Sequence, residues 1–259
     1  MRVYLDHNAT TPLDPEVLAA MTPFLVEKFG NPNSLHTWGR EARQTLERAR
    51  ALIAGALGAT DRDSIVFTSG GTEADNLALI GTATARGEGG RHVIVSCVEH
   101  HAVLNTARHL SRQGFEVTYL SVDSEGLLDP DDVSRAIRPD TILVSLMHGN
   151  NETGVLFPIA SVGRLCRERG VTFHTDAVQS FGKVPLDVEA LQVDLLSLSG
   201  HKIHGPKGIG ALYIRRGTRM QPLLFGGMQE RSRRAGTENV AAAIGLARAT
   251  ELSLQDANG

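Results

Sequence analysis

The chain has 259 residues, of which 41% are hydrophobic and 21% are charged, with a formal net charge of −3. This composition is typical of a globular protein, and the small net charge gives no electrostatic reason to expect nucleic acid or a membrane surface as a partner. The sequence has no apolar run long enough to span a membrane and no apolar signal-peptide core. Its two cysteines, Cys97 and Cys166, do not form a disulfide framework, so we expect a reduced, cytoplasmic setting.

Short β-rich runs alternate with helical patterns along the chain. The predicted strands are Ile65–Thr68, His92–Ser96, Glu116–Val122, Thr141–Met147, Val171–Asp176, Leu195–Ser199 and Gly210–Arg215. The predicted helices are Pro15–Lys28, Leu35–Leu57, Thr72–Arg86, His100–Gln113, Pro130–Ile137, Pro158–Glu168 and one that begins near Asn239. Several strands are apolar on both faces, which suits buried parallel strands. The pattern predicts an α/β fold with a mainly parallel seven-stranded sheet and helices on both faces.

Polar residues follow five of these predicted strands. In open α/β sheets, ligands bind beyond the carboxyl ends of the strands. The five strand ends supply a glycine loop, an imidazole, amides, a carboxylate and a lysine: Ser69-Gly70-Gly71-Thr72, Glu99-His100-His101, Asn150-Asn151, Asp176 with Gln179, and Ser199-Gly200-His201-Lys202. The sequence therefore predicts a functional site along one edge of the sheet.

The glycine loop Ser69–Thr72 joins a predicted strand to a predicted helix. Glycines let backbone N–H groups approach an anion closely, and a helix N-terminus favours negative charge by roughly 0.3–1 kcal/mol. The loop is therefore a candidate phosphate site. A tight turn with Thr72 as the helix N-cap explains the same residues. It is not a P-loop, because no Gly-Lys-Ser/Thr follows.

Lysine is scarce, since only Lys28, Lys183, Lys202 and Lys207 occur. Lys202 alone follows directly on a predicted strand end, where it could form a Schiff base with a cofactor aldehyde. A solvated loop lysine is the competing interpretation. Lys207 lies between Pro206 and Gly208 and is the fallback candidate, either as a turn residue or as a neighbour of phosphate.

Asp176 ends a largely apolar strand, where an unpaired carboxylate would be costly. A protonated pyridine nitrogen or an arginine could equally be its partner. His100 could stack on a flat ring or move protons, or it could simply start a helix.

A cysteine nucleophile and a metal site are both weakly supported. Cys97 lies three residues before His100, but its place at the end of an apolar strand suits a small hydrophobic residue. The histidines lack the spacing of a structural zinc site, so we expect no metal.

Eight motifs in order then resemble one family, the cysteine desulfurases of the nitrogen-fixation and iron–sulfur-cluster type, which have the class V aminotransferase fold. The motifs are Tyr4-Leu-Asp-His-Asn-Ala-Thr-Thr-Pro12, Gly30-Asn-Pro-Asn-Ser34, Phe67-Thr-Ser-Gly-Gly-Thr-Glu-Ala-Asp-Asn76, Glu99-His-His101, Asn150-Asn-Glu-Thr-Gly154, Asp176-Ala-Val-Gln179, Ser197-Leu-Ser-Gly-His-Lys-Ile-His-Gly-Pro-Lys-Gly-Ile-Gly210 and Arg234-Ala-Gly-Thr-Glu-Asn239. The resemblance implies the large domain of a transferase that uses pyridoxal 5′-phosphate (PLP). It also implies conversion of L-cysteine to L-alanine, with the sulfur held on the enzyme as a persulfide.

The resemblance also implies residue roles. Lys202 would bind PLP covalently and later carry a proton, and Asp176 would hold the pyridine nitrogen. His100 would stack on the ring and take part in proton transfer. Gln179 would bond the ring hydroxyl, and Asn151 would face the cofactor and the substrate carboxylate.

The phosphate would be held by Gly71, Thr72, Ser199 and His201 by the same resemblance. Thr237 would reach the phosphate of a neighbouring subunit, because sites of this family lie at a homodimer interface. An iron–sulfur scaffold or another sulfur-acceptor protein would be a further partner.

The chain departs from the family in three respects. Members are longer, and their nucleophilic cysteine and carboxylate-binding arginine follow the point where this chain ends. Met228 stands where a glycine is expected. We therefore expect residues 1–14 to belong to a mostly missing small domain and residues 15–259 to form the PLP-binding domain. We also expect a chain without that cysteine and arginine to be inactive in sulfur transfer. Another class V lyase or aminotransferase, or a non-catalytic PLP-binding dimer scaffold, are the alternatives.

Overall fold

The computed structural model describes residues 1–85 and 90–256. Seven strands form one sheet with the order β1-β7-β6-β5-β4-β2-β3. The strands are β1 (Ile65–Thr68), β2 (His92–Ser96), β3 (Glu116–Leu120), β4 (Thr141–Met147), β5 (Thr172–Asp176), β6 (Leu195–Ser199) and β7 (Gly210–Ile214). Neighbouring strands pair in parallel from β3 to β6, whereas β7 is antiparallel to both β6 and β1. The predicted mainly parallel seven-stranded sheet is confirmed.

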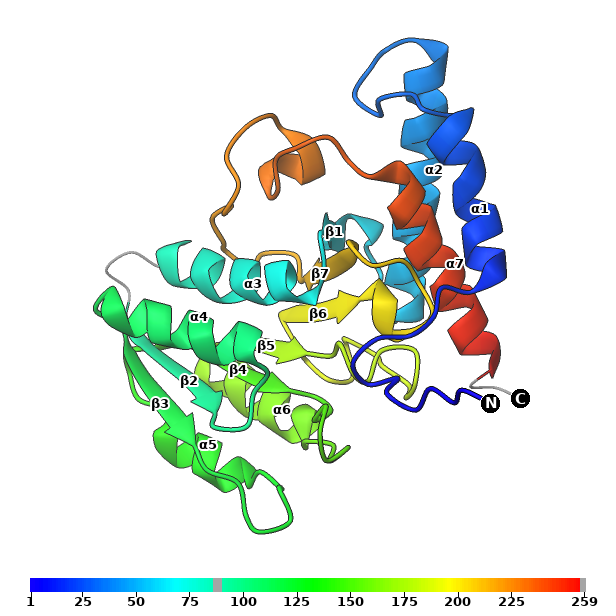
Figure 1. Cartoon of the computed structure of the whole chain (residues 1–259). Coiled ribbons are helices and arrows are strands. Elements are labelled where there is room, and N and C mark those ends of the chain that lie inside the picture. Colours follow the sequence, from blue (N-terminus) through cyan, green and yellow to red (C-terminus); the bar gives the residue numbers. More distant parts are fainter. Residues whose placement is uncertain (86–89, 257–259) are drawn as a thin grey trace.

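Within the described residues, seven α-helices surround the sheet (Figure 1). They are α1 (Pro15–Val26), α2 (Thr37–Ala56), α3 (Gly71–Ala85), α4 (His101–Arg112), α5 (Pro130–Ala136), α6 (Ile159–Arg169) and α7 (Val240–Asp256). The predicted end of α3 at Arg86 and the last three residues of the predicted domain, 257–259, lie outside the described residues.

Helices cover both faces of the sheet because alternate strand residues point to opposite sides. Val66 packs with α3 and α4 residues such as Leu77 and Leu110 in one apolar cluster. Its neighbours Ile65 and Phe67 belong to a second, larger cluster, which also contains residues of α1, α2, α5, α6 and α7. The helices α1, α2 and α7 stand together at the β1 end of the sheet (Figure 1).

Local sequence signals mark several helix ends. Proline stands at the first position of α1 and of α5, and the preceding Asp14 and Asp129 accept hydrogen bonds from backbone N–H groups of the first turn. Gly170 ends α6 in the left-handed conformation that glycine adopts without strain. Pro158 and His100 precede their helices as N-caps rather than lying inside them.

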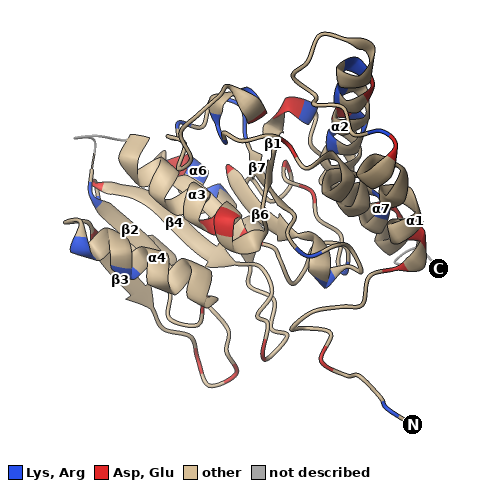
Figure 2. Cartoon of the chain, turned by 45° about the horizontal axis from the view of Figure 1, so that its top comes forward, with Lys and Arg blue, Asp and Glu red and all other residues tan. Residues whose placement is uncertain are grey.

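Basic and acidic residues are interspersed, with both signs on α2 and in the loop between β7 and α7 (Figure 2). Among the described residues, no helix is long and apolar enough to cross a membrane.

A buried ion pair fixes the long loop between β7 and α7 to the edge strand β1. Arg50 on α2 makes two hydrogen bonds to Glu230, of 2.7 and 2.8 Å, and both side chains are 2% exposed. Arg50 also donates to the carbonyl of Ile65, and Glu230 accepts from the N–H of Phe67. β1 is an edge strand of the described sheet, so its outer backbone N–H and C=O groups have no neighbouring strand. The ion pair supplies hydrogen-bond partners for two of these groups.

Removing one partner of this pair should be strongly destabilising. Glu230→Ala leaves the buried guanidinium of Arg50 with the 3.3 Å contact to Glu47 in place of its two hydrogen bonds to Glu230. We expect a loss of about 3–5 kcal/mol in the free energy of unfolding. Urea denaturation followed by circular dichroism measures the loss. The control is Arg248→Ala, which removes an exposed pair with Glu16 and should move the midpoint little. Equal midpoints for the two variants would contradict the structural role of the buried pair.

Candidate functional site

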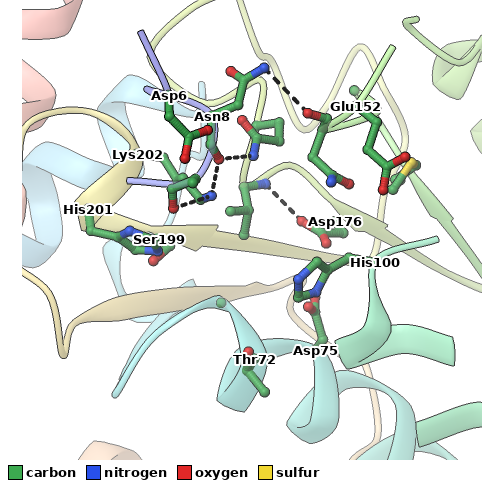
Figure 3. Close-up of a pocket in the computed structure, with 17 residues that line it drawn as sticks. Asp6, Asn8, Thr72, Asp75, His100, Glu152, Asp176, Ser199, His201 and Lys202 are labelled. Carbon is green, nitrogen blue, oxygen red and sulfur yellow. Dashed lines mark hydrogen bonds between the residues drawn. The ribbon is translucent and has the colours of Figure 1, made fainter. Parts of the chain in front are cut away.

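A cavity of about 520 Å³ opens at the carboxyl edge of the sheet (Figure 3). Nine of the ten predicted site residues line it: Gly71, Thr72, His100, Asn151, Asp176, Gln179, Ser199, His201 and Lys202. They come from the segments that follow β1, β2, β4, β5 and β6. Parallel pairing brings the ends of β2, β4, β5 and β6 together, and β1 runs in the same direction because it and β6 are both antiparallel to β7. Residues far apart in sequence therefore meet in one cavity.

Thr237 is the exception among the ten. It is exposed, lies in the loop before α7, and is absent from the lining of the cavity. Thr237 therefore does not line the cavity of its own chain. The role expected for Thr237 at the site of a neighbouring subunit stays a prediction.

One end of the cavity has the features of an anion site. Gly71 begins α3, whose first-turn N–H groups have no intrahelical partners. A Cβ at Gly71 would lie 2.6 Å from Cγ2 of Val178, so only glycine fits there. The hydroxyl of Ser199 at the end of β6 is buried and has no hydrogen-bond partner among the described residues. Together with Thr72 and His201, these groups offer donors to an anionic group.

Lys202 lies in the short helix η2 (Gly200–Lys202) directly after β6. Its ammonium donates to the backbone carbonyls of Asn8 and Ala9, at 2.9 Å in the second case. Partial burial lowers the pKa of Lys202, and the nearby charge of Lys183 lowers it further. A lysine whose pKa is lowered is a better nucleophile at neutral pH.

Asp176 is buried at the end of β5, and Oδ1 accepts a hydrogen bond of 2.9 Å from the N–H of Val178. Burial raises its pKa, while that hydrogen bond and the charges of His100 and Lys202 act in the opposite direction. His100 lies beside Asp176 in Figure 3. Neither arginine nor lysine forms an ion pair with Asp176 in the described chain, so the salt-bridge interpretation finds no support.

Two further buried carboxyl groups lie near the cavity, and both belong to family motifs in which the sequence assigns them no role. Glu99 accepts from the hydroxyl of Ser96 at 2.5 Å and from the N–H of Met147 at 3.0 Å, and burial raises its pKa to about 8. Asp75 on α3 lines the cavity, and its Oδ1 is buried without a hydrogen-bond partner. Burial, and then the charge of Asp176, raise the pKa of Asp75. Glu99 is therefore largely protonated near pH 7, and the raised pKa of Asp75 favours its protonated form as well.

Asp75 lies close to a buried histidine without forming an ion pair. Its Oδ1 is 3.7 Å from Nε2 of His174, but burial lowers the pKa of His174 to about 3. His174 is thus neutral, and its ring nitrogens instead bond the hydroxyls of Ser145 and Ser197. Ser145, His174 and Ser197 lie within β4, β5 and β6, so the sequence signal for this layer is a polar residue inside a predicted strand.

The N-terminal segment forms one side of the cavity through Asp6, Asn8 and Ala9. The carbonyl of Asn8 accepts from Gln179 as well as from Lys202, and the Asn8 amide donates to the carbonyl of Asn151. Figure 3 shows this segment across the cavity from Thr72 and Asp75 of α3. These residues belong to a family motif, but the sequence assigns them no role, because they precede the first helix and follow no strand.

The cysteines lie away from the cavity. Cys97 is exposed in the turn after β2, and Cys166 is buried on α6, where burial raises the pKa of its thiol to about 12. Neither lines the cavity. Within residues 1–85 and 90–256, no group of three His, Cys, Asp or Glu side chains could hold a metal ion.

Comparison with known proteins agrees with this arrangement. The aminotransferase class-V family model matches residues 3–258. The cysteine desulfurase IscS of Dictyoglomus turgidum is 56% identical over 97% of this chain, and the putative cysteine desulfurase IscS 1 of Bacillus subtilis is 53% identical over 98%. This chain belongs to the cysteine desulfurase group of the class-V aminotransferases.

Solved structures of this family superimpose closely on the chain. A NifS-like protein matches with a TM-score of 0.97 at 44% identity and covers 100% of this chain. A structure described as SspA in complex with cysteine matches with a TM-score of 0.94 at 44% identity and covers 96% of this chain. The chain corresponds to 71% and 72% of those two structures, and to 64% of the Dictyoglomus turgidum relative and 67% of the Bacillus subtilis relative.

The buried acid Glu99 predicts a pH-dependent stability. Its pKa is about 8 in the folded chain against 4.5 for a free side chain, so the folded state holds an additional proton between these values. The wild type should therefore lose stability relative to Glu99→Gln as the pH rises through this window, by about 1.4 kcal/mol for each pH unit. Urea denaturation at pH 5.5, 6.5 and 7.5 measures the difference. Parallel pH profiles for the two proteins would contradict a neutral Glu99.

Proposed function

We propose that the cavity binds PLP and that the protein is a PLP-dependent cysteine desulfurase, which converts L-cysteine to L-alanine and retains the sulfur as a persulfide. The observation that carries the proposal is the position of Lys202, Asp176 and the α3 N-terminus around one cavity. These are an amine, a buried acid and an anion site, which match the aldehyde, the pyridine nitrogen and the phosphate of PLP. The names of the similar proteins support the same activity.

The residues of the cavity fit this cofactor. A phosphate would supply hydrogen-bond acceptors for three groups that have none among the described residues. They are the hydroxyl of Ser199 and the first-turn N–H groups of Gly71 and Thr72. His201 completes this end of the cavity. Asp176, buried without a cationic partner among the ion pairs, gains one from a protonated ring nitrogen, which would lower its pKa again.

When bound, PLP supplies the electron sink that stabilises negative charge at the substrate α-carbon. The side chains of this chain would orient the cofactor and move protons. Lys202 would bind it covalently and carry a proton at Nζ, and Asp176 would keep the ring nitrogen protonated. His100, exposed beside Asp176, would stack on the ring and exchange a proton with the substrate.

Two amides would complete the orientation of the reactants. Gln179, whose Nε2 now donates to the carbonyl of Asn8, would turn to the ring hydroxyl. Asn151 lines the cavity and would face the substrate carboxylate. Cys97 and Cys166 lie outside the cavity lining, and we assign the sulfur-accepting step to neither.

We further propose a homodimer in which Thr237 serves the phosphate of the partner's site, and an iron–sulfur scaffold or similar protein as the sulfur acceptor. The exposed position of Thr237 outside the cavity lining supports the first. A cytoplasmic location suits two free cysteines. Residues 1–14, which contain no helix or strand, would belong to a small domain and residues 15–259 to the PLP-binding domain.

Covalent attachment tests the role of Lys202. Protein incubated with PLP and then reduced with borohydride should carry the pyridoxyl group on Lys202, because its amine lies in the cavity and its pKa is lowered. Peptide mapping by mass spectrometry locates the adduct, and Lys202→Ala should lose it. An adduct on Lys207 or Lys183 in the wild-type protein would overturn the assignment.

Asp176→Ala tests the contact with the ring nitrogen. The charge-assisted hydrogen bond is worth roughly 1.5–3 kcal/mol, so PLP affinity should fall by about ten- to a hundredfold. Asp176→Glu should have a smaller effect because it keeps the carboxylate. Titration of PLP followed by absorbance measures both. An unchanged affinity and spectrum in Asp176→Ala would count against this role.

The overall activity is tested by alanine and sulfide production from L-cysteine by the full-length protein, with a thiol reductant that releases the persulfide sulfur as sulfide and with Lys202→Ala as the control. Mercaptopyruvate as the product would favour an aminotransferase, and pyruvate formed with sulfide would favour another lyase of the same family. PLP binding without turnover would favour the non-catalytic dimer scaffold.

A further inference from the structure

We propose that Arg234 is a positioning residue for the phosphate end of the cavity. In this proposal, Arg234 neutralises Glu73, a carboxylate on the first turn of α3, and through Glu73 fixes the glycine loop that approaches the phosphate. The inference rests on the proposed PLP site and adds to it two residues outside the ten assigned there.

The contacts form a chain from the loop before α7 to the glycine loop. Nε of Arg234 donates to Oε1 of Glu73 at 2.8 Å, and its terminal nitrogen donates to Oε2 at 3.3 Å. Oε2 also accepts from the backbone N–H of Ser69 at 2.7 Å. One carboxylate therefore joins Arg234 to the residue that precedes Gly70 and Gly71.

The position of Glu73 calls for a compensating cation. It lines a second cavity of about 450 Å³ that shares Gly71, Thr72 and Ser199 with the main cavity, at its phosphate end. An unpaired carboxylate there would repel a bound phosphate, and the charge is only partly screened because the side chain is 17% exposed. Arg234 is the one ion-pair partner of Glu73 in the described chain.

The pairing keeps Glu73 ionised. Burial alone would raise its pKa, but the hydrogen bonds from Arg234 and Ser69 lower it below the ordinary value. Among the other side chains lining the second cavity, His201 and Lys207 are the ones that can carry positive charge. They lie on the segment after β6, so they would attract phosphate without being bonded to Glu73.

Arg234 is itself held in place. Its loop is anchored four residues earlier by the buried pair of Glu230 with Arg50. The backbone of Glu230, Arg231 and Ser232 has positive φ angles of 45°, 57° and 62°, a conformation that non-glycine residues adopt only when surrounding contacts enforce it. The loop therefore presents the Arg234 guanidinium to α3 at a fixed position.

The test is a double-mutant cycle with two ligands, PLP and pyridoxal, which lacks the phosphate. Arg234→Gln should weaken PLP roughly tenfold or more and pyridoxal by less than about threefold, because the uncovered charge of Glu73 acts on the phosphate. Glu73→Gln removes that charge and keeps an oxygen for the N–H of Ser69. Adding it to Arg234→Gln should therefore return PLP affinity to within about threefold of the wild type.

The matched control is Arg231→Gln, which removes the same charge from the same loop but breaks contacts with Glu47 and Asp63, away from α3. It should leave the ratio of PLP to pyridoxal affinity unchanged. Arg234→Lys keeps the positive charge but loses the bidentate contact with Glu73. Its PLP affinity should lie between those of the wild type and Arg234→Gln. Unfolding midpoints without ligand confirm that each variant is folded.

Inorganic phosphate provides a readout without cofactor. Phosphate should raise the unfolding temperature of the wild type and of the double variant, and raise that of Arg234→Gln less. Equal losses of PLP and pyridoxal in Arg234→Gln, or no recovery in the double variant, would overturn the proposal. A wild type that gains no stability from phosphate would also overturn it. An adduct absent from Lys202 despite stabilisation by phosphate would instead count against the proposed PLP site and leave the role of Arg234 standing.

Discussion

Parallel pairing of β2, β4, β5 and β6 is the constraint on which the cavity depends. Because these strands run in one direction, the segments that follow them all emerge at the same edge. A ligand there is surrounded by residues from four or five separate parts of the chain, none of which could form a site alone. The helices on both faces exclude water from the strands, and the resulting low polarity raises the pKa of carboxyl groups at the strand ends, as at Asp176.

The site balances charge by protonation as well as by ion pairing. Three carboxyl groups, Asp75, Glu99 and Asp176, are buried near one another, and full ionisation of all three would be costly. Because burial favours the protonated forms of Asp75 and Glu99, Asp176 is the acid best placed to meet a cation in the cavity. At the opposite end, Glu73 remains ionised because Arg234 pairs with it. The proposed cofactor would add a cation beside Asp176 and an anion beside α3.

Much of this arrangement is predictable from the sequence. The predicted strands match the observed ones nearly to the residue because each is a short run of β-branched and apolar residues bounded by glycine, proline or polar residues. Nine of the ten site residues gather in the cavity because strand ends mark the edge of a parallel sheet. The family resemblance supplies their proposed roles, which the residues alone leave open for Lys202, Asp176 and the glycine loop.

Other features depend on contacts distant in sequence. No local pattern reveals that β7 inserts antiparallel between β1 and β6, or that Arg50 pairs with Glu230. The segment with Asp6 and Asn8 has no periodicity to place it, yet it closes one side of the cavity. Two predicted elements are slightly too long: the strand Glu116–Val122 and the helix Leu35–Leu57. In each case the backbone hydrogen bonding ends before the run of residues that favour a strand or a helix.

The antiparallel insertion of β7 has a consequence for the order of folding. In the register of the sheet, Ile65 pairs with Tyr213, so β1 joins the sheet only when a strand distant in sequence is in place. Pairings of such high sequence separation form slowly, because a long loop must close before any contact is gained. During synthesis the ribosome must release β7 before β1 can be fixed. The glycine loop that follows β1 would then be among the last parts of the cavity to take shape, so a nascent chain would acquire its anion-binding end only after the rest of the sheet had assembled.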